Sequence, residues 1–255
     1  MAKSIVDFQI IDNKQINKDF FILELLSGSI LPQIYPGQFV QVRIDGSTDT
    51  FLRRPFSVHD VNIGANTIKL LIQIAGRGTE TLSLLRRGDN LNLILPLGNS
   101  FSLPAKGERT LLIGGGCGAA PLLYLAKYLK SNSCEFDILL GFRNKDRIIE
   151  YGEYSKLGKV YLTTEDGSEG EKGYVTDHSV LLGNKYRRIY CCGPDSMMRA
   201  VATYSRKNKM HCEVSLENLM ACGIGVCLCC VVNTTNGNVC TCTDGPVFNI
   251  NNLKW

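Results

Sequence analysis

Hydrophobic and polar positions alternate in short runs between residues 5 and 102. The runs FFILELL, QFVQVRI, TIKLLIQIA and NLNLILPL each have the length of one β-strand, and turn residues such as Pro36-Gly37 and Gly88-Asp89 separate them. Several short strands at this spacing are typical of an antiparallel barrel or sandwich. We therefore predict a β-barrel domain over residues 1–103.

The pattern changes after residue 103. Apolar strand-like runs such as TLLIGGG, FDILLGF, KVYLTT and RIYCCG alternate with stretches of helical character, among them AAPLLYLAKYLKS, DRIIEYGEYSKL, VTDHSVLL and PDSMMRAVATYSRKN. Alternating strands and helices predict a parallel sheet that is covered by helices. Residues 104–210 are therefore expected to form a Rossmann-like α/β domain.

The last segment, residues 211–255, is rich in Cys, Gly, Asn and Thr and shows little helical periodicity. It is too short for a conventional hydrophobic core, and a metal centre is one way in which such a module is held together. The predicted fold class is thus multidomain β plus α/β: an antiparallel barrel, a Rossmann-like parallel-sheet domain and a small C-terminal metal module.

Composition narrows the possible partners. The chain has 255 residues, and 28 basic against 24 acidic side chains give a formal net charge of +4 without any long run of like charges. Nothing in this balance indicates nucleic acid or anionic lipid. No apolar run has the length of a signal peptide or a membrane span, so a cytoplasmic location is expected. In that reducing compartment, the 11 cysteines favour metal binding or buried thiols over disulfides.

The cysteine cluster near the C-terminus has an informative spacing. Four residues separate Cys222 from Cys227, two separate Cys227 from Cys230, and a distant fourth ligand completes the pattern of plant-type two-iron clusters. Zinc is the alternative, although a zinc ribbon normally has two close cysteine pairs. Spacing alone leaves both Cys240 and Cys242 open as the fourth ligand.

Two motifs in the first domain suit a flavin dinucleotide. The run Arg54, Pro55, Phe56 and Ser57 offers a guanidinium, an aromatic face and a hydroxyl within four residues. The run AGRGTETLSLL places Gly78 and Thr79 before a helical turn, whose backbone amides suit a pyrophosphate. Solvated arginines on a strand edge and an ordinary Thr-capped turn are the simpler explanations for each motif alone. Together they predict FAD.

A glycine-rich turn between a strand and a helix predicts a dinucleotide site in the second domain. Its glycines are Gly114, Gly115, Gly116 and Gly118. A tight turn without a ligand is the alternative. The acidic residue expected at the end of the next strand is missing, since Glu135 stands at its beginning, and we expect the ribose contact from Thr163–Ser168 instead. Cys192 ends another strand, where it either lies near a nicotinamide or serves as a small buried side chain.

Taken in order, the motifs PGQFV, RRPFS, GRGT, PLGN, GGGCGAAPL, GFR, TTEDGS, CGP and MACGIGVCLCC…CTDGPVF resemble the ferredoxin-reductase superfamily. Within it, the chain is most similar to the electron-transfer subunits of NAD-dependent dihydroorotate dehydrogenase. The resemblance covers essentially the whole chain, and its specific part is the cysteine module. It implies a flavin-binding barrel, a nicotinamide-binding α/β domain and a terminal two-iron module.

The resemblance also assigns residues. It implies that Arg54 binds the FAD pyrophosphate, that Ser57 approaches the reactive flavin nitrogen, and that Gly78 and Thr79 hold phosphate through backbone groups. The family's last cluster ligand stands just before Asp-Gly-Pro. By similarity, therefore, the cluster ligands are Cys222, Cys227, Cys230 and Cys242. The chain departs from the family pattern at Cys117 and Ala119-Ala120 in the glycine turn, and Cys229 is additional.

The implied function is an oxidoreductase subunit that relays electrons for pyrimidine biosynthesis. An FMN-containing catalytic subunit would oxidise dihydroorotate, and electrons would reach NAD through the [2Fe-2S] cluster and FAD in a heterotetramer with two copies of each chain. No acid–base site stands out, so no catalytic residue is expected here. The alternatives are a flavin subunit of an NAD(P)H:ferredoxin oxidoreductase or sulfhydrogenase, in which Asp often replaces the first ligand, Cys222, and a zinc-stabilised module without redox function. The choice between NAD and NADP stays open.

Overall fold

The computed structural model describes residues 3–46, 50–183 and 185–255, and the chain divides into two compact units. One consists of Met1–Ser100, Asn218–Val232 and Asn238–Pro246, and is called the barrel unit below. The other consists of Phe101–Glu217, Asn233–Gly237 and Val247–Trp255, and is called the parallel-sheet unit. The C-terminal segment thus contributes to both units.

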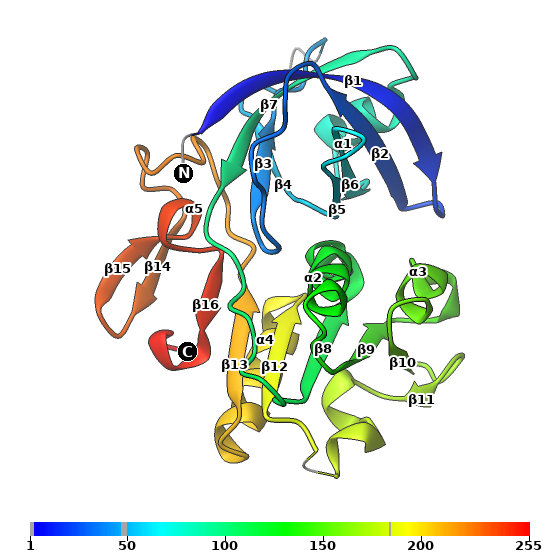
Figure 1. Cartoon of the computed structure of the whole chain (residues 1–255), viewed down its shortest axis with the longest axis vertical. Helices are drawn as coiled ribbons and strands as arrows, with labels where there is room; N and C mark the ends of the chain where they lie inside the picture. The colour runs from blue at the N-terminus through cyan, green and yellow to red at the C-terminus, as the bar shows by residue number, and fades with distance from the viewer. Residues whose placement is uncertain (1–2, 47–49, 184) are drawn as a thin grey trace. The chain divides into compact units, whose positions relative to one another are not determined.

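The barrel unit is built on a seven-stranded sheet with the order β4-β3-β7-β1-β2-β6-β5. All neighbouring strands run antiparallel, and the sheet curves into a half-barrel (Figure 1). The strands are β1 (Ser4–Gln15), β2 (Phe20–Ser27), β3 (Phe39–Val42), β4 (Arg54–Ser57), β5 (Asp60–Asn62), β6 (Thr67–Gln73) and β7 (Asn90–Leu97), and the unit also contains the helix α1 (Arg77–Ser83). The antiparallel barrel predicted from the alternating pattern is confirmed.

The parallel-sheet unit holds a second seven-stranded sheet, with the order β11-β10-β9-β8-β12-β13-β16. Its strands are β8 (Thr110–Gly115), β9 (Phe136–Phe142), β10 (Lys159–Thr164), β11 (Glu171–Lys172), β12 (Arg188–Cys192), β13 (His211–Ser215) and β16 (Val247–Asn249). All of them run parallel except β16, which pairs antiparallel with β13 at one edge. The predicted Rossmann-like parallel sheet is therefore also confirmed.

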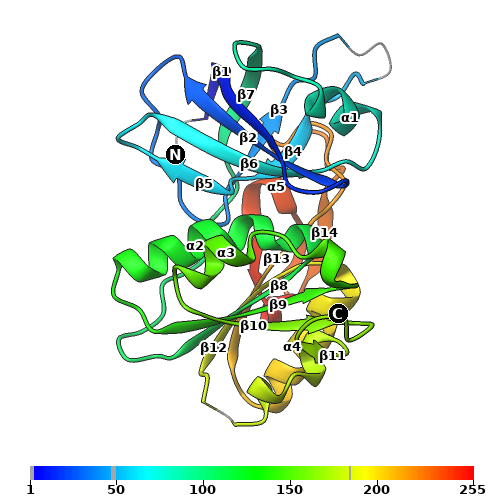
Figure 2. The same cartoon turned by 90° about the vertical axis from the view of Figure 1, so that its right-hand side faces the viewer.

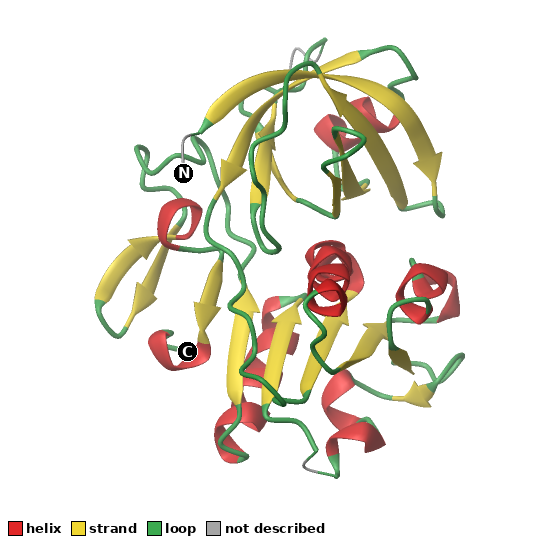
Figure 3. Cartoon of the chain, in the orientation of Figure 1, coloured by secondary structure: helices red, strands yellow, loops and turns green. Residues whose placement is uncertain are grey.

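Helices cover both faces of the parallel sheet. The helices α2 (Ala119–Ser131) and α3 (Tyr151–Ser155) lie on one face, and α4 (Asp195–Lys207) lies on the other (Figures 2 and 3). The strand order reverses between β8 and β12, because the chain adds β9 and β10 on one side of β8 and β12 and β13 on the other. Ligands of open α/β sheets bind at such a switch point, beyond the carboxyl ends of the strands.

The expected helix in VTDHSVLL is replaced by two short 3-10 turns, η3 (Val175–Asp177) and η4 (Ser179–Leu181). Polar side chains bind the backbone there: the Asp177 carboxylate accepts the Tyr174 N–H at 2.8 Å, and His178 Nδ1 accepts the Val180 N–H at 2.9 Å. Such bonds compete with helical ones, so the helix does not continue. The stretch DRIIEYGEYSKL likewise forms only η2 (Lys145–Arg147) and the short α3.

The C-terminal segment has little regular structure of its own. A hairpin of β14 (Val231–Thr234) and β15 (Gly237–Cys240) is followed by the single-turn helix α5 (Thr241–Asp244), and η5 (Ile250–Asn252) follows β16. The boundary predicted at residue 210 falls directly before β13. The three domain ranges 1–103, 104–210 and 211–255 stay a prediction. Among the described residues, no helix combines the length and the apolar character needed to cross a membrane.

Candidate redox cofactor sites

A tight loop wraps the first two cysteines of the cluster motif. The Sγ atom of Cys222 accepts three backbone N–H groups, each at 3.4 Å, from Ile224, Val226 and Cys227. Gly223 and Gly225 have φ angles of 69° and 90°, which let the loop turn its amides towards this sulfur. Partial burial opposes ionisation, but the amides lower the pKa of Cys222 to about 6. The loop therefore favours a thiolate, the form that binds metal.

The other two predicted ligands form a second, buried pair. The backbone N–H of Cys242 donates to the Sγ atom of Cys230 at 3.4 Å, and the two residues are only 1% and 2% exposed. Burial, together with the neighbouring Cys230 thiol, raises the pKa of Cys242 to about 12. Metal binding would have to displace this proton.

The four cysteines are thus arranged as two pairs, Cys222 with Cys227 and Cys230 with Cys242. This donor set fits a two-iron cluster, which is held by four thiolates shared between two irons. Among the described residues, no three His, Cys, Asp or Glu side chains are grouped closely enough to hold one metal ion. Cys240 lies beside the second pair, and its N–H donates to the Asp244 carboxylate at 3.1 Å.

The barrel provides the apolar floor of this cysteine site. Phe39 of β3 and Leu97 of β7 form one buried cluster with Cys230, Cys240 and Cys242. The partly buried Ile94 and Met220 pack against it. The cysteine site therefore belongs to the barrel unit, because its buried cysteines pack against side chains of the barrel strands.

The RPFS motif lies on the strand next to this floor. It forms β4, which pairs with β3 so that Ser57 stands opposite Phe39 and Pro55 opposite Gln41. Neighbouring strands of a sheet are about 4.8 Å apart. The Arg54 guanidinium donates to the Leu52 carbonyl at 2.9 Å. The strand β3 thus lies between the cysteine site and β4, the strand that is predicted to hold the flavin.

The second flavin motif forms the start of α1. The Thr79 hydroxyl accepts the Ala75 N–H at 2.8 Å and the Gly76 N–H at 3.2 Å, and it donates to the Gly76 carbonyl at 2.8 Å. A Cβ on Gly78 would lie 2.9 Å from the Ile44 side chain. The Thr79 hydroxyl therefore shapes the turn, and the backbone groups are what this motif offers to a phosphate.

The glycines of the strand–helix turn fall into two kinds. Gly114, Gly115 and Gly118 are packed closely, whereas Gly116 has a φ of 53° and open space where a Cβ would stand. The tightest contact is at Gly118, where a Cβ would lie 2.1 Å from the Cys192 carbonyl oxygen. Gly118 thus lets α2 approach the end of β12, and Gly116 is the position open to a ligand.

The ends of β8 and β12 meet at the switch point. A Cβ on Gly193, which follows β12, would lie 3.2 Å from the Gly115 nitrogen. Cys192 is buried, its Sγ donates to the Ser215 carbonyl at 3.5 Å, and burial raises its pKa. Of the two interpretations made from the sequence, the structure therefore favours Cys192 as a small buried side chain. In the segment expected to meet the ribose, the Thr163 hydroxyl, near the end of β10, is buried and has no hydrogen-bond partner among the described residues.

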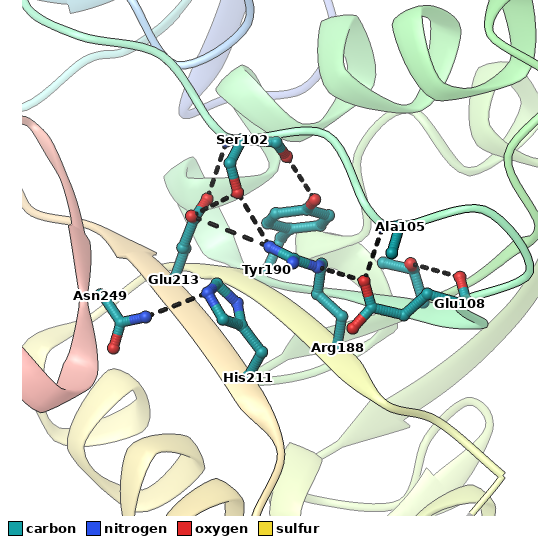
Figure 4. A network of polar contacts seen from close by, with 9 residues as sticks. Ser102, Ala105, Glu108, Arg188, Tyr190, His211, Glu213 and Asn249 are labelled. Carbon is teal, nitrogen blue, oxygen red and sulfur yellow. Dashed lines mark hydrogen bonds and ion pairs between the residues drawn. The ribbon is translucent and has the colours of Figure 1, made fainter.

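A polar network at the amino ends of β12 and β13 was not recognised in the sequence. Arg188 donates through Nε to the Glu108 carboxylate at 3.0 Å and through a terminal nitrogen to the Ser102 hydroxyl at 2.8 Å (Figure 4). The same hydroxyl donates to Glu213 at 2.6 Å, and the Ser102 carbonyl accepts the Tyr190 hydroxyl. The network lies at the strand ends opposite the glycine turn and anchors residues 102–108 to the sheet. It is structural.

Taken together, the flavin-type half-barrel, the Rossmann-like sheet and the paired cysteines define an oxidoreductase of the ferredoxin-reductase class. Residues 112–203 match the oxidoreductase NAD-binding domain, and residues 217–254 match the iron–sulfur cluster binding domain of dihydroorotate dehydrogenase B. These matches support the predicted NAD and iron–sulfur cluster as cofactors, and the fold supports the predicted FAD.

Several relatives cover nearly all of the chain. It is 34% identical to the dihydroorotate dehydrogenase B (NAD(+)) electron transfer subunit of Desulforamulus reducens, over 98% of both proteins. It is 42% identical to the subunit of the same name from Caldanaerobacter subterraneus, over 84% of this chain and 85% of that one. The chain belongs to the family of dihydroorotate dehydrogenase B electron transfer subunits, as its motifs predicted.

Solved structures agree on the fold. The structure of an NADH-dependent reduced ferredoxin-NADP oxidoreductase, described in work on flavin-based electron bifurcation, superposes with a TM-score of 0.87 at 30% identity, over 97% of this chain and 90% of that one. The ferredoxin reductase of carbazole 1,9a-dioxygenase, at 19% identity, superposes over 82% of this chain and 66% of that one with a TM-score of 0.69, which shows the shared fold.

Proposed function

We propose that this chain relays electrons between NAD and an FMN-containing dihydroorotate dehydrogenase catalytic subunit, in the cytoplasm and in the service of pyrimidine biosynthesis. The family that the chain belongs to supports this function. The observation that carries it is the arrangement around β3, whose Phe39 packs on the cysteine site and whose neighbour β4 bears the RPFS motif. A flavin site and a cluster site one strand apart suit an electron relay.

The residues that would hold the cofactors follow from the predicted motifs. Cys222 and Cys227 would bind one iron of a [2Fe-2S] cluster, and Cys230 and Cys242 the other. FAD would be held by Arg54, Pro55, Phe56, Ser57, Gly78 and Thr79, and NAD by the turn of Gly114, Gly115, Gly116 and Gly118. When bound, the flavin exchanges a hydride with NAD and single electrons with the cluster.

The chain itself supplies the surroundings for this chemistry. The amides of the Cys222 loop stabilise thiolate charge, and the apolar floor under Cys230 keeps water from that half of the site. The outer side of the loop is apolar and open to solvent. Its most exposed large side chains are Leu219, Val226 and Leu228, at 87%, 75% and 63%.

We propose that the catalytic subunit docks on this loop, in a heterotetramer with two copies of each chain. Exposed apolar side chains that border a redox site are suited to a protein interface. The described residues include all eleven cysteines, and none forms a disulfide, which supports a reducing, cytoplasmic location.

The relay is tested with Cys222→Ser and the control Cys229→Ser, both prepared without oxygen. We expect Cys222→Ser to lose the iron–sulfur absorption, to keep FAD and its reduction by NADH, and to lose flavin reduction by dihydroorotate when the copurified FMN subunit is present. Cys229→Ser should behave like wild type, because the Cys229 side chain is exposed and outside both cysteine pairs.

Three results would contradict the proposal. The first is a colourless wild-type protein that contains zinc. The second is a folded Cys222→Ser protein whose flavin NADH no longer reduces. The third is a native pull-down without an FMN protein that oxidises dihydroorotate; recovery of a ferredoxin instead would favour the ferredoxin oxidoreductase alternative.

A further inference from the structure

Gln41 is a buried polar residue whose side-chain amide has no hydrogen-bond partner among the described residues. Its side chain extends from β3, the residue is 0% exposed, and neither Oε1 nor Nε2 has a hydrogen-bond partner among the described residues. No other side chain in the described part of the chain has two such atoms. Because a buried amide without partners costs free energy, its complete burial suggests that a group outside the described protein satisfies it.

The amide lies directly against the loop that wraps the cluster motif. A Cβ on Gly223, the residue after Cys222, would lie 2.6 Å from both Cγ and Nε2 of Gln41. Gly223 can approach so closely because it has no side chain, and its φ of 69° is one that glycine adopts readily. The same strand carries Phe39, two residues away and on the same face, which packs against Cys230 and Cys242. One short strand thus contacts both cysteine pairs.

We propose that the Gln41 side-chain amide donates a hydrogen bond to the iron–sulfur cluster, to a sulfide or to a ligating thiolate, and thereby raises the reduction potential of the cluster. The inference rests on the proposed function, because it requires the cluster. Reduction adds negative charge to the sulfurs, so a donated hydrogen bond stabilises the reduced state more than the oxidised one. In this role Gln41 contacts the cluster but does not itself react.

Gln38 provides a matched control on the same segment of chain. It is also a buried glutamine, but its Oε1 accepts the Tyr35 N–H at 2.8 Å and its Nε2 donates to the Gly98 carbonyl at 2.9 Å. Gln38→Leu therefore breaks protein hydrogen bonds and should lower thermal stability. Gln41→Leu breaks none that is made within the described protein.

The test is a redox titration of the cluster in the complete FAD-containing protein, followed by EPR. In Gln41→Leu, we expect the ratio of reduced to oxidised cluster at a fixed potential to fall about tenfold, as for one hydrogen bond to a charged acceptor, which is a shift of about 59 mV to more negative potential. The flavin potential and the cluster content should match wild type. Gln38→Leu should keep the wild-type cluster potential.

A wild-type cluster potential in Gln41→Leu, with the cluster fully loaded, would overturn the inference. A shift confined to the flavin potential would also overturn it, because Gln41 would then serve the flavin across β4. Either result leaves the proposed function standing. A wild-type protein that contains no cluster would overturn the proposed function itself.

A second measurement does not depend on the stability of a variant. Wild-type protein labelled with ¹⁵N at its glutamine side-chain amides should show, by pulsed EPR of the reduced cluster, a coupling between the electron spin and a labelled nitrogen. Gln38→Leu should retain this coupling. Its absence from the wild-type protein would refute the hydrogen bond even if Gln41→Leu failed to fold.

Discussion

Replacement of Arg188 by methionine should destabilise the parallel-sheet unit strongly. The Arg188 side chain is 11% exposed, and its guanidinium lies 3.0 Å from the Glu108 carboxylate and 3.9 Å from that of Glu213. Methionine fills much of the same space but leaves two nearly buried carboxylates without their cation. Removing one partner of a buried ion pair costs about 3–5 kcal/mol, and a domain of this size is stable by only about 5–15 kcal/mol.

The assay is urea unfolding followed by circular dichroism, with Arg187→Met as the control because Arg187 is exposed beside Arg188. We expect the unfolding free energy of the parallel-sheet unit to fall by about 3–5 kcal/mol in Arg188→Met and by less than about 0.5 kcal/mol in the control. The triple variant Arg188→Met, Glu108→Gln, Glu213→Gln should recover part of the loss, since no charge is then left unpaired. A loss below about 1 kcal/mol in Arg188→Met would refute the reasoning.

The unfolding free energies of wild type and Arg188→Met should depend on pH in a direction that the structure predicts. Burial alone would raise the pKa of Glu108, but hydrogen bonds from the Ala105 N–H and from Arg188 hold it below the ordinary value. Burial, and then the charge of Arg188, lowers the pKa of His211, which also bonds to Asn249 at 3.0 Å. Groups whose folded pKa is depressed stabilise the fold above their unfolded pKa and lose that contribution as the pH falls.

Wild-type stability should therefore decline as the pH falls below about 6.5, where His211 titrates in the unfolded chain. It should decline again below about 4.5, where Glu108 titrates in the unfolded chain. In Arg188→Met the Glu108 carboxylate loses the cation that helps to lower its pKa, so acid relieves part of the penalty. The difference in stability between the two proteins should shrink as the pH is lowered from 7 to 4. A difference that widened would contradict the proposed ion pairs.

Three further predictions concern the cofactor sites. Cys242→Ser should lose the iron–sulfur absorption while Cys240→Ser keeps it, as measured by visible spectra and iron content; the opposite result would make Cys240 the fourth ligand. Gly118→Ala should lower the unfolding free energy by about 1–3 kcal/mol, because its Cβ would meet the Cys192 carbonyl at 2.1 Å. Gly116→Ala, placed in open space at positive φ, should cost about 1 kcal/mol in thermal unfolding and mainly raise the KM for NADH.

The fold could be predicted where the pattern is local. Val40 and Val42 point into the barrel and are fully buried, as the alternation in QFVQVRI indicates. The cysteine loop was predictable for the same reason, because the short spacing of Cys222, Cys227 and Cys230 keeps all three in one segment of chain. The pairing of Cys242 with Cys230 needed the family resemblance, because 11 residues of hairpin and turn separate them.

The alternation misplaces Gln41 for a physical reason. It lies on the outer face of β3, where the pattern predicts contact with solvent, yet the loop around Gly223 covers it. The loop around Gly223 is far from Gln41 in the sequence, and it has no periodic pattern from which this contact could be predicted. Arg188 is similar: its partners Ser102 and Glu108 lie in an irregular segment more than 75 residues earlier, as the contact separations of 86 and 80 residues show. Local pattern cannot indicate such contacts.

The motif PLGN gains a role from these long-range contacts. Gly98 has a φ of 74°, and a Cβ there would lie 2.5 Å from Pro246. The next residue, Asn99, donates its backbone N–H to the Gly245 carbonyl at 2.6 Å and its side-chain amide to the Asp244 carbonyl at 2.9 Å. The turn after β7 therefore holds the Asp-Gly-Pro segment that directly follows the cysteine site.

The cysteine site is consequently fixed to the barrel from two directions. On one side Phe39 and Gln41 of β3 contact the cysteine residues and their loop, and on the other side Asn99 holds the chain just after Cys242. Because β4, with the RPFS motif, is hydrogen-bonded to β3, the sites proposed for the flavin and the cluster should keep a fixed separation. The glycine turn that is predicted to bind NAD belongs to the other unit, so we expect a mutation there to alter hydride exchange without changing the contacts of the cysteine site.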